Sequence, residues 1–513
     1  MLLCDLVHTS RRLAETSSRL EKIARLSSYL ERLSFDEIAI GVSYCVGRLR
    51  QGNIGIGPAL LQAAQPAQAA HHPCLTLTDV DQGFEKLAHT TGPGSAEARL
   101  RLLRALLAKA TRDEQQFLAQ LIQGALRQGA MEGIMVEAIA RAAHLPVSEV
   151  RRALMLEGDL AAVAQAALAQ GTVQAFHLTL FKPVLPMLAQ PVSDLSEALE
   201  HLGEAAFEYK MDGVRIQLHK MGHEVRVFTR TLHDVTHAVP ELVELAQGMP
   251  AQTVVLDGEV LAFRVDGTPH PFQTTMRRFG RKTHVATLRH HLPLTPFFFD
   301  CLHLAGEDLI DQPTRLRVAA LQQVVPEPFL TPRFVTPHLE EARQFFKQAL
   351  AAGHEGVMAK ALDAPYEAGC RGSTWLKMKH IHTLDLVILA AEWGHGRRKG
   401  WLSNLHLGAR DPASGQFVML GKTFKGLTDA LLEWQTQTLQ TLKVAQDEST
   451  VYVRPELVVE IAFNDIQASP HYPAGLALRF ARVKRFRPDK SANQADTIDT
   501  VRALYTRLKG GTF

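Results

Sequence analysis

The spacing of apolar residues changes twice along the chain, and these changes constrain the fold more than any other feature of the sequence. From residue 1 to about 175, apolar residues recur at helical spacing. Residues 190 to 380 mix helical and strand-like segments, and short β-rich segments with glycine turns follow from about 381. At 513 residues the chain is also too long for a single hydrophobic core. We therefore expect several domains with different secondary structure.

The first region has the pattern of an all-α domain. Its earliest helical repeat consists of Leu13, Leu20, Ile23, Leu26, Leu30 and Leu33. The sequence Ser34-Phe35-Asp36-Glu37 is a capping box, which typically starts a new helix. A proline-broken stretch at residues 182–188 then interrupts the helical pattern. These features predict a helical domain over residues 1–182.

The remaining residues predict two further domains. Residues 183–380 are expected to form an α+β domain, with strands at 225–230, 254–263, 297–302 and 356–360. Residues 381–513 are expected to form a small β-barrel, with strands at 384–391, 405–409, 417–420 and 458–463.

Composition excludes several classes of protein. No apolar run is long enough to cross a bilayer, and the first residues lack the basic flank and cleavage site of a secretory signal. The cysteines are widely spread and include no C-x-x-C pair: Cys4, Cys45, Cys74, Cys301 and Cys370. A disulfide framework or a four-cysteine zinc site is therefore not expected. We predict a cytoplasmic protein without membrane association.

Positive charge is concentrated near the end of the chain, although the net charge is only +3. Residues 479–490 contain a single acid, Asp489, among these cations: Arg479, Arg482, Lys484, Arg485, Arg487 and Lys490. Such a concentration favours a polyanionic partner, either a nucleoside triphosphate or a nucleic acid. A solvated strand face is the alternative interpretation for Arg479, Arg482 and Arg485.

The stretch Glu208-Tyr209-Lys210-Met211-Asp212-Gly213-Val214-Arg215 has the pattern of a reactive lysine site. Lys210 is expected at a strand end, before a turn at Asp212 and Gly213. A lysine attacks only after losing its proton, and neighbouring cations with partial burial lower its pKa from about 10. The octapeptide alone is equally compatible with a solvated lysine at a hairpin end.

Four later motifs support the reactive interpretation. They are Leu256-Asp257-Gly258-Glu259, Phe298-Phe299-Asp300, Glu355-Gly356-Val357-Met358-Ala359-Lys360 and Trp375-Leu376-Lys377-Met378-Lys379. Each motif places a charged or aromatic residue at the rim of an apolar strand. Carboxylates, an aromatic ring and several lysines around one nucleophilic lysine suit the binding of a nucleotide and a divalent metal.

In this order the motifs resemble the nucleotidyltransferase superfamily of ATP-dependent DNA ligases, RNA ligases and capping enzymes. The resemblance extends to Ser469-Pro470, Leu478-Arg479-Phe480-Ala481-Arg482 and Arg487-Pro488-Asp489-Lys490. Ala481 stands where the family usually has proline. The helical first third is similar to the DNA-binding domain of cellular and archaeal-type ligases. The resemblance therefore implies an all-α DNA-binding domain, an α+β adenylation domain and a β-barrel of the OB-fold type.

The resemblance also implies a role for each motif residue. Lys210 would attack the α-phosphate of ATP and form a lysyl-AMP adduct. Glu208 would accept a hydrogen bond from the adenine amino group, Phe299 would stack on adenine, and Glu259 would hold the ribose. The implied phosphate ligands are Arg215, Arg230, Arg371, Lys377 and Lys379. Glu259 and Glu355 would lie near a magnesium ion or another divalent cation.

The function implied is that of an ATP-dependent DNA ligase that seals nicks in duplex DNA. The resemblance further suggests a cytoplasmic, nucleoid-associated monomer. An RNA ligase or capping enzyme shares the central motifs, but the helical first domain argues against both. A DNA-binding protein without catalytic activity is a third interpretation, which the presence of every expected reactive residue disfavours. An NAD-dependent ligase is disfavoured by the lack of a cysteine zinc site.

Overall fold

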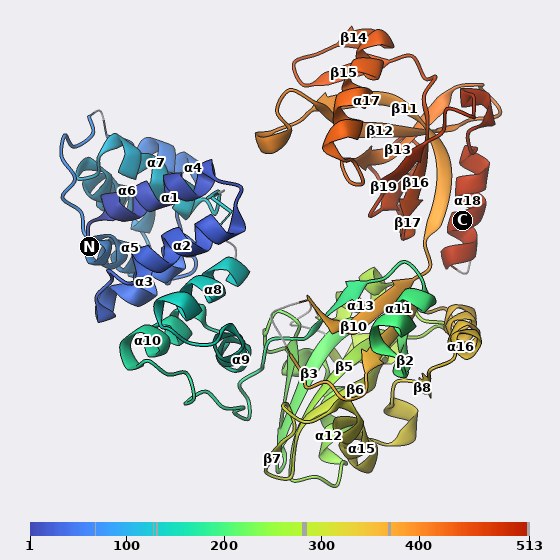
Figure 1. The fold of residues 1–513 in the computed structure, drawn as a ribbon, viewed down its shortest axis with the longest axis horizontal. Coiled ribbons are helices and arrows are strands. Elements are labelled where there is room, and N and C mark those ends of the chain that lie inside the picture. The colour runs from blue at the N-terminus through green and yellow to red at the C-terminus, as the bar shows by residue number, and fades with distance from the viewer. Residues whose placement is uncertain (67, 127, 130–131, 280–284, 368–370, 510–513) are drawn as a thin grey trace. The chain divides into compact units, whose positions relative to one another are not determined.

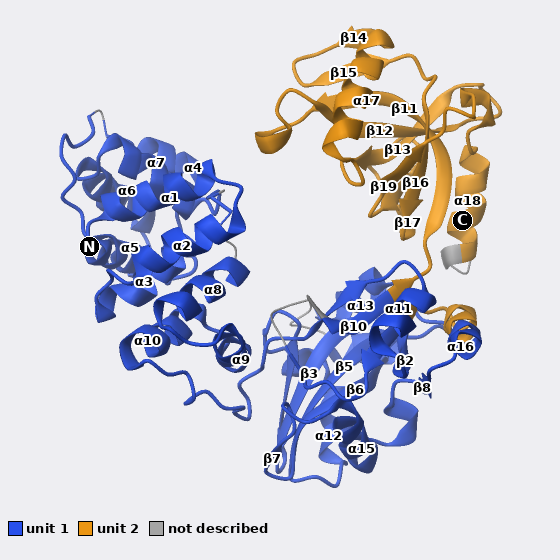
Figure 2. Cartoon of the chain, in the orientation of Figure 1, with its two compact units in different colours: residues 1–345, 358–377 blue, residues 346–357, 378–513 orange. Residues whose placement is uncertain are grey.

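The computed structural model describes residues 1–513 except 67, 127, 130–131, 280–284, 368–370 and 510–513. The chain divides into two compact units, which Figure 2 shows in different colours. The first unit contains residues 1–345 and 358–377, and the second contains residues 346–357 and 378–513. Among the described residues, no helix has both the length and the apolar content needed to cross a lipid bilayer.

The first part of the first unit is helical, as predicted (Figure 1). Its helices are α1 (Leu3–Glu15), α2 (Arg19–Leu30), α3 (Phe35–Cys45), α4 (Pro58–Ala63), α5 (Leu77–His89), α6 (Ser95–Ala108), α7 (Arg112–Ile122), α8 (Glu132–Ala142), α9 (Val147–Glu157) and α10 (Leu160–Gln170). The predicted capping box is present at the start of α3, where the Ser34 N–H donates to Glu37 Oε2 (3.0 Å). Thr76 and Thr111 cap α5 and α7 in the same way.

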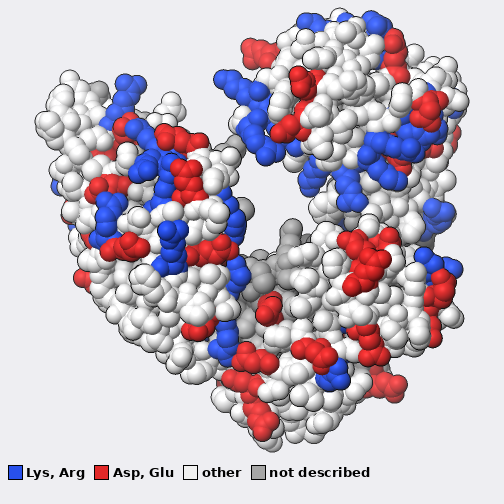
Figure 3. All heavy atoms as spheres, viewed as in Figure 1, with Lys and Arg blue, Asp and Glu red and all other residues white. Residues whose placement is uncertain are grey.

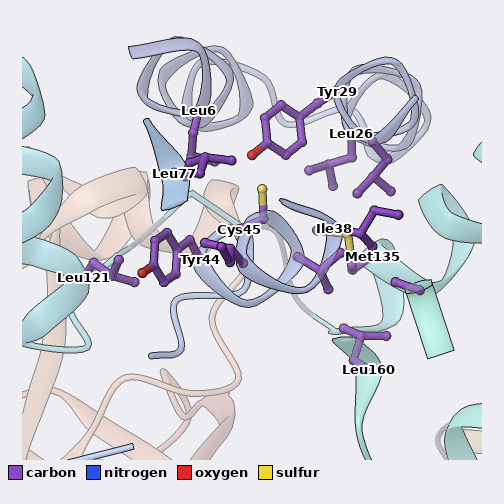
Figure 4. Close-up of a cluster of buried hydrophobic side chains, with 14 of the residues drawn as sticks. Leu6, Leu26, Tyr29, Ile38, Tyr44, Cys45, Leu77, Leu121, Met135 and Leu160 are labelled. Carbon is purple, nitrogen blue, oxygen red and sulfur yellow. The ribbon is translucent and has the colours of Figure 1, made fainter. Parts of the chain in front are cut away.

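One hydrophobic core holds these helices together. Figure 4 shows Leu26 of α2, Ile38 of α3 and Leu160 of α10 among the side chains of this cluster. Leu20 shares the predicted helical spacing but is 77% exposed, in the first turn of α2. Burying one leucine contributes roughly 1.5–3 kcal/mol, so core packing stabilises these short helices more than helix propensity does.

The central part of the chain contains two five-stranded sheets. The strand orders are β1-β10-β9-β2-β8 and β4-β3-β5-β6-β7. The strands are β1 (Leu188–Pro191), β2 (Ala205–Lys210), β3 (Val214–Met221), β4 (Glu224–Thr229), β5 (Thr253–Ala262), β6 (Leu294–Leu304), β7 (Glu307–Asp308), β8 (Arg333–Thr336), β9 (Gly356–Ala361) and β10 (Arg371–Lys379). The strands predicted at 225–230, 254–263, 297–302 and 356–360 are confirmed as β4, β5, β6 and β9.

Short helices connect these strands. They are α11 (Leu195–Leu202), η1 (Thr236–Ala238), α12 (Pro240–Gln247), α13 (Phe272–Phe279), α14 (Val285–His291), α15 (Thr314–Val324), η2 (Glu327–Phe329) and α16 (Leu339–Ala351). Side chains from α12, α15 and the β3–β5–β6 sheet share one core, which includes Leu242, Leu321 and Leu256.

The passage from β2 to β3 positions Lys210. β2 belongs to one sheet and β3 to the other, so the chain crosses between the sheets at residues 211–213. Lys210 is the last residue of β2, and the prediction that it ends a strand before a turn is confirmed. Its backbone is therefore fixed at a point from which both sheets can supply neighbouring side chains.

The second unit is rich in β-structure. Its elements are β11 (His382–Trp393), η3 (Gly396–Arg398), β12 (Leu402–Arg410), β13 (Phe417–Thr423), α17 (Asp429–Thr441), β14 (Lys443–Gln446), β15 (Thr450–Val453), β16 (Val458–Phe463), β17 (Asp465–Ala468), β18 (Leu476–Arg479), β19 (Arg482–Phe486), η4 (Ala492–Gln494) and α18 (Ile498–Lys509). The strands predicted at 384–391, 405–409, 417–420 and 458–463 are confirmed within β11, β12, β13 and β16.

Strand β11 organises this unit. Along one edge of β11, residues 382–387 pair with β16 and residues 390–392 pair with β15. The other edge of β11 pairs with β12. The register with β12 shifts between Ile388 and Ala390. A register shift of this kind bends a strand and increases its twist. The single strand β11 therefore pairs with β16 in its first half and with β15 in its second half. The core of this unit includes Leu386, Ile388 and Leu407.

Candidate active site

A cavity of about 630 Å³ lies at the end of β2 in the first unit. Both sheets contribute to its walls, and α13 adds Phe272, Met276 and Phe279. Seven of the residues predicted for the site line it: Lys210, Glu208, Arg215, Arg230, Glu259, Phe299 and Lys377. The sequence separates these residues by up to 169 positions, from Glu208 to Lys377, and the fold brings them to one cavity.

The turn after Lys210 is packed closely against β5. The Gly213 N–H donates to Glu259 Oε1 at 3.1 Å. A Cβ atom at position 213 would lie 2.4 Å from the carbonyl oxygen of Val260, which real Cβ atoms do not tolerate. Lys210 Nζ is 3.5 Å from the carbonyl oxygen of Met211. Glycine at 213 therefore allows the turn to bring Lys210 close to Glu259.

Glu259 is a cavity carboxylate whose pKa is changed by its surroundings. Burial raises its pKa to about 7, and the positive charges of Lys210 and Arg215 act in the opposite direction. The carboxylate and the Lys210 amine therefore influence each other electrostatically. The pKa of Glu259 therefore lies closer to neutral pH than that of an ordinary glutamate.

Glu208 is held between two cations. Its side chain is 2% exposed, and it forms ion pairs with Arg333 and, at 2.7 Å, with Lys360. Lys360 Nζ lies 4.5 Å from the ring centroid of Phe299 and 4.1 Å from that of Trp375. Burial lowers the pKa of Lys360, and the charge of Glu208 opposes this change. The carboxylate, the ammonium and the two rings thus form one compact wall.

Arg215 is held by several groups at once. Its Nε and Nη2 donate to the two oxygens of Asp257 at 3.0 and 2.6 Å. Its Nη1 donates to the carbonyl oxygen of Met187 at 2.6 Å, and Tyr366 Oη donates to Asp257 at 2.7 Å. The guanidinium is therefore fixed in orientation at the cavity wall.

Three predicted residues are not placed at the cavity by the described structure. Lys379 and Glu355 belong to the second unit, pair with each other at 2.6 Å, and are absent from the described lining of the cavity. The side chain of Arg371 lies outside the described residues. Their roles toward phosphate and metal stay predictions.

Three residues at or next to the cavity wall were not predicted from the sequence: Lys360, Trp375 and Arg333, which contacts Glu208. Lys360 and Trp375 stand inside motifs that the sequence analysis identified, so their position in these motifs was the available signal. Arg333 belongs to none of these motifs. It reaches Glu208 because β8 pairs with β2, and local sequence does not reveal which strands are neighbours.

The basic segment near the end of the chain is partly neutralised within the second unit. Lys484 and Arg485 pair with Glu460 at 2.9 and 2.6 Å. Arg487 and Lys490 pair with Asp385 at 2.9 and 2.5 Å. Figure 3 shows Lys and Arg gathered on this unit with Asp and Glu among them. The predicted partner would therefore compete with carboxylates for these cations.

A lysine at a strand end, in a cavity that combines carboxylates, an aromatic wall and further cations, is the arrangement expected of a covalent nucleotidyltransferase. Three family models match the chain and identify a narrower class. "ATP dependent DNA ligase domain" matches residues 186–379, "DNA ligase N terminus" matches 59–140, and "ATP dependent DNA ligase C terminal region" matches 398–490. The chain belongs to the family of ATP-dependent DNA ligases.

Relatives agree over nearly the whole chain. A probable DNA ligase of Anaeromyxobacter sp. (strain Fw109-5) is 57% identical over 511 residues, covering 99% of this chain and 98% of the relative. A probable DNA ligase of Sorangium cellulosum (strain So ce56) is 55% identical over 514 residues, covering 100% of this chain and 96% of the relative. The solved structure "Pmar-Lig_Pre." has 19% identity and a TM-score of 0.63, covering 94% of this chain and 99% of that chain. That last similarity concerns the fold alone.

Proposed function

We propose that this ligase seals nicks in duplex DNA through a lysyl-AMP intermediate on Lys210. The observation that carries the proposal is the cavity at the end of β2, which Lys210 shares with six other residues predicted for nucleotide binding. Family membership supports both ATP as the nucleotide and nicked DNA as the substrate.

In the first step the deprotonated Lys210 Nζ attacks the α-phosphorus of ATP. A nitrogen–phosphorus bond forms, the bond to the bridging oxygen breaks, and pyrophosphate leaves. Glu208 accepts from the adenine amino group, Phe299 stacks on the base, and Glu259 holds the ribose. The proposed phosphate ligands are Arg215, Arg230, Arg371, Lys377 and Lys379. Such fixed cations stabilise the charge that develops during phosphoryl transfer.

Two further transfers complete the proposed reaction. The 5′-phosphate at the nick attacks the lysyl-AMP phosphorus, which releases Lys210 and forms an adenylated 5′ end. The adjacent 3′-hydroxyl then attacks the 5′-phosphate, AMP leaves, and the strand is sealed. Both steps transfer a phosphoryl group to an oxygen nucleophile, so the same cations serve each of them.

The residues of the cavity fit a magnesium ion that arrives with ATP. Glu259 lines the cavity, and Mg²⁺ commonly uses one or two carboxylates together with substrate phosphates. Among the described residues, no group of three or more His, Cys, Asp or Glu side chains forms a separate metal site. A bound divalent cation would neutralise phosphate charge. Glu259 would hold it, with Glu355 as the second predicted ligand.

The proposed domains follow the changes in sequence pattern: residues 1–182 bind DNA, residues 183–380 carry out adenylation, and residues 381–513 form an OB-fold. Support for the OB-fold comes from the bent β11 and the strands that pair along it. We expect this last domain to close over ATP and then to grip DNA. A cytoplasmic monomer acting on nucleoid DNA in replication, repair or recombination completes the proposal.

The test begins with labelled ATP and magnesium. Wild-type protein should retain labelled AMP after denaturing electrophoresis, and Lys210→Ala should not. Equal labelling of both proteins would contradict the role of Lys210. A nicked duplex should be sealed with ATP but not with NAD. If only RNA ends are joined, the activity is that of an RNA ligase.

A further inference from the structure

Arg333 and Glu208 are direct partners on neighbouring antiparallel strands. The register of β2 and β8 places Glu208 opposite Arg333, and the guanidinium forms an ion pair with Glu208 Oε1. Both side chains are largely buried, at 15% exposed for Arg333 and 2% for Glu208. A buried ion pair of opposite strand neighbours fixes the direction of both side chains.

The same guanidinium also contacts the aromatic wall. Arg333 Nη2 donates to the carbonyl oxygen of Phe299 in β6 at 3.2 Å. The loop before β8 also contacts β6, because the Thr331 N–H donates to the carbonyl oxygen of Phe298 at 2.9 Å. Arg333 therefore connects the carboxylate and the aromatic residue that are proposed to bind the edge and the face of the base.

Lys360 holds the other oxygen of the carboxylate. Its Nζ is 2.7 Å from Glu208 Oε2, so each oxygen has one cationic partner. An ionised carboxylate can accept about four hydrogen bonds, which leaves acceptor capacity on Glu208 for a ligand. With its orientation fixed by Arg333 and Lys360, the Glu208 side chain offers a ligand in the cavity only hydrogen-bond acceptors.

We infer that Arg333 is a positioning residue that determines which purine the cavity accepts. This inference rests on the proposed function, because it concerns the nucleotide that reacts with Lys210. A carboxylate held by Arg333 and Lys360 favours a base that offers an amino group. Adenine presents an N6 amino donor, whereas guanine presents the O6 acceptor at the same place. Arg333 thereby acts on specificity through Glu208 and without contacting the base.

The test measures AMP-adduct formation with ATP and with purine riboside triphosphate, which lacks the amino group. Wild-type protein should prefer ATP by about 100-fold in second-order rate constant, because the analogue has no amino group to donate to the remaining acceptor sites of the Glu208 carboxylate. Arg333→Met should reduce this preference at least about tenfold, since a carboxylate with one partner can turn away from the base. Arg333→Lys should recover part of the preference, because lysine keeps the charge but not the forked geometry.

Arg315→Met is the matched control, because Arg315 forms an exposed ion pair with Asp363 at 2.7 Å in the same unit. Its nucleotide preference should equal that of the wild type. If Arg333→Met is too unstable to fold, the preference for ATP over the analogue is measured with Arg333→Gln and Arg333→Lys instead.

Each result decides the inference. A lower preference in the Arg333 variants, with the control unchanged, supports it. An unchanged preference with both nucleotides slowed equally overturns it, because a merely structural role would act on both. Wild-type protein that reacts with both nucleotides alike overturns the inference and leaves the proposed function intact. Wild-type protein that forms no adduct overturns the proposed function itself.

Discussion

Arg215 and Asp257 form a two-point ion pair at the wall of the nucleotide cavity, with distances of 3.0 and 2.6 Å. The Asp257 side chain is 2% exposed and that of Arg215 is 15% exposed. Asp257 also accepts from Tyr366 Oη, so one carboxylate serves two buried donors. Asp257, two positions before the predicted site residue Glu259, therefore has a structural role as the anchor of Arg215.

Asp257→Ala should strongly destabilise the protein, because it leaves the Arg215 charge buried without its carboxylate. Removing one partner of a buried pair costs about 3–5 kcal/mol in the free energy of unfolding. Thermal and urea unfolding will measure the loss. Asp363→Ala breaks the exposed pair with Arg315 and should change stability little. Equal stability of the two variants would contradict the anchoring role of Asp257.

Gly213→Ala should impair adduct formation. The new Cβ would lie 2.4 Å from the Val260 carbonyl oxygen and 2.8 Å from Glu259 Cγ, so the turn after Lys210 must shift. Overpacking of this kind costs about 1–3 kcal/mol. Labelling with ATP and thermal unfolding will test both effects. Gly133→Ala, in α8 with no atom within 4 Å of the added Cβ, should keep wild-type activity and stability or gain stability.

Glu259 should make the stability of the protein fall as the pH rises toward neutrality. Its pKa is raised from 4.5 to about 7. Between these values the folded protein keeps a proton that the unfolded chain has lost, so ionisation costs more in the folded state. The total effect is roughly 3 kcal/mol at 1.36 kcal/mol per pKa unit.

Urea unfolding of Glu259→Gln at pH 5 and pH 8 will isolate this effect. The free energy of unfolding of the variant minus that of wild type should be larger at pH 8 than at pH 5, because glutamine does not titrate. Glu244→Gln is the control, since the Arg289 partner lowers the pKa of the exposed Glu244. The free energy of unfolding of Glu244→Gln minus that of wild type should not be larger at pH 8 than at pH 5. Parallel pH profiles for wild type and Glu259→Gln would refute the prediction.

Glu460→Gln should strengthen DNA binding and increase its salt dependence. The change removes the charge that neutralises Lys484 and Arg485, which are 58% and 64% exposed. Each additional phosphate contact steepens the dependence of log K on log salt by about 0.9 for duplex DNA. Titration of a nicked duplex over a range of salt will measure the slope. Glu433→Gln makes the same charge change on α17. An equal slope in both variants would place the DNA contacts elsewhere.

Local sequence was sufficient for the parts of the fold that depend on neighbouring residues. The helical first region, the capping box at Ser34 and Glu37, and the strand end at Lys210 all follow from the order of apolar, polar and turn-forming residues. Motif order also identified seven residues that line the cavity. The helical pattern, the capping box and the strand end depend on interactions within a few residues of the chain, so the sequence by itself determines them, whereas the motifs name the cavity residues without bringing them together.

Tertiary structure decided which of these side chains meet. Glu208 meets Arg333 only because β8 lies beside β2, across 125 positions of sequence. Lys379 and Glu355 belong to the predicted motifs, yet they pair with each other and are absent from the described lining of the cavity. Burial also raised the pKa of Glu259, which no residue pattern reveals. Strand pairing and desolvation arise from packing of distant segments, and for that reason they appear only when the chain is folded.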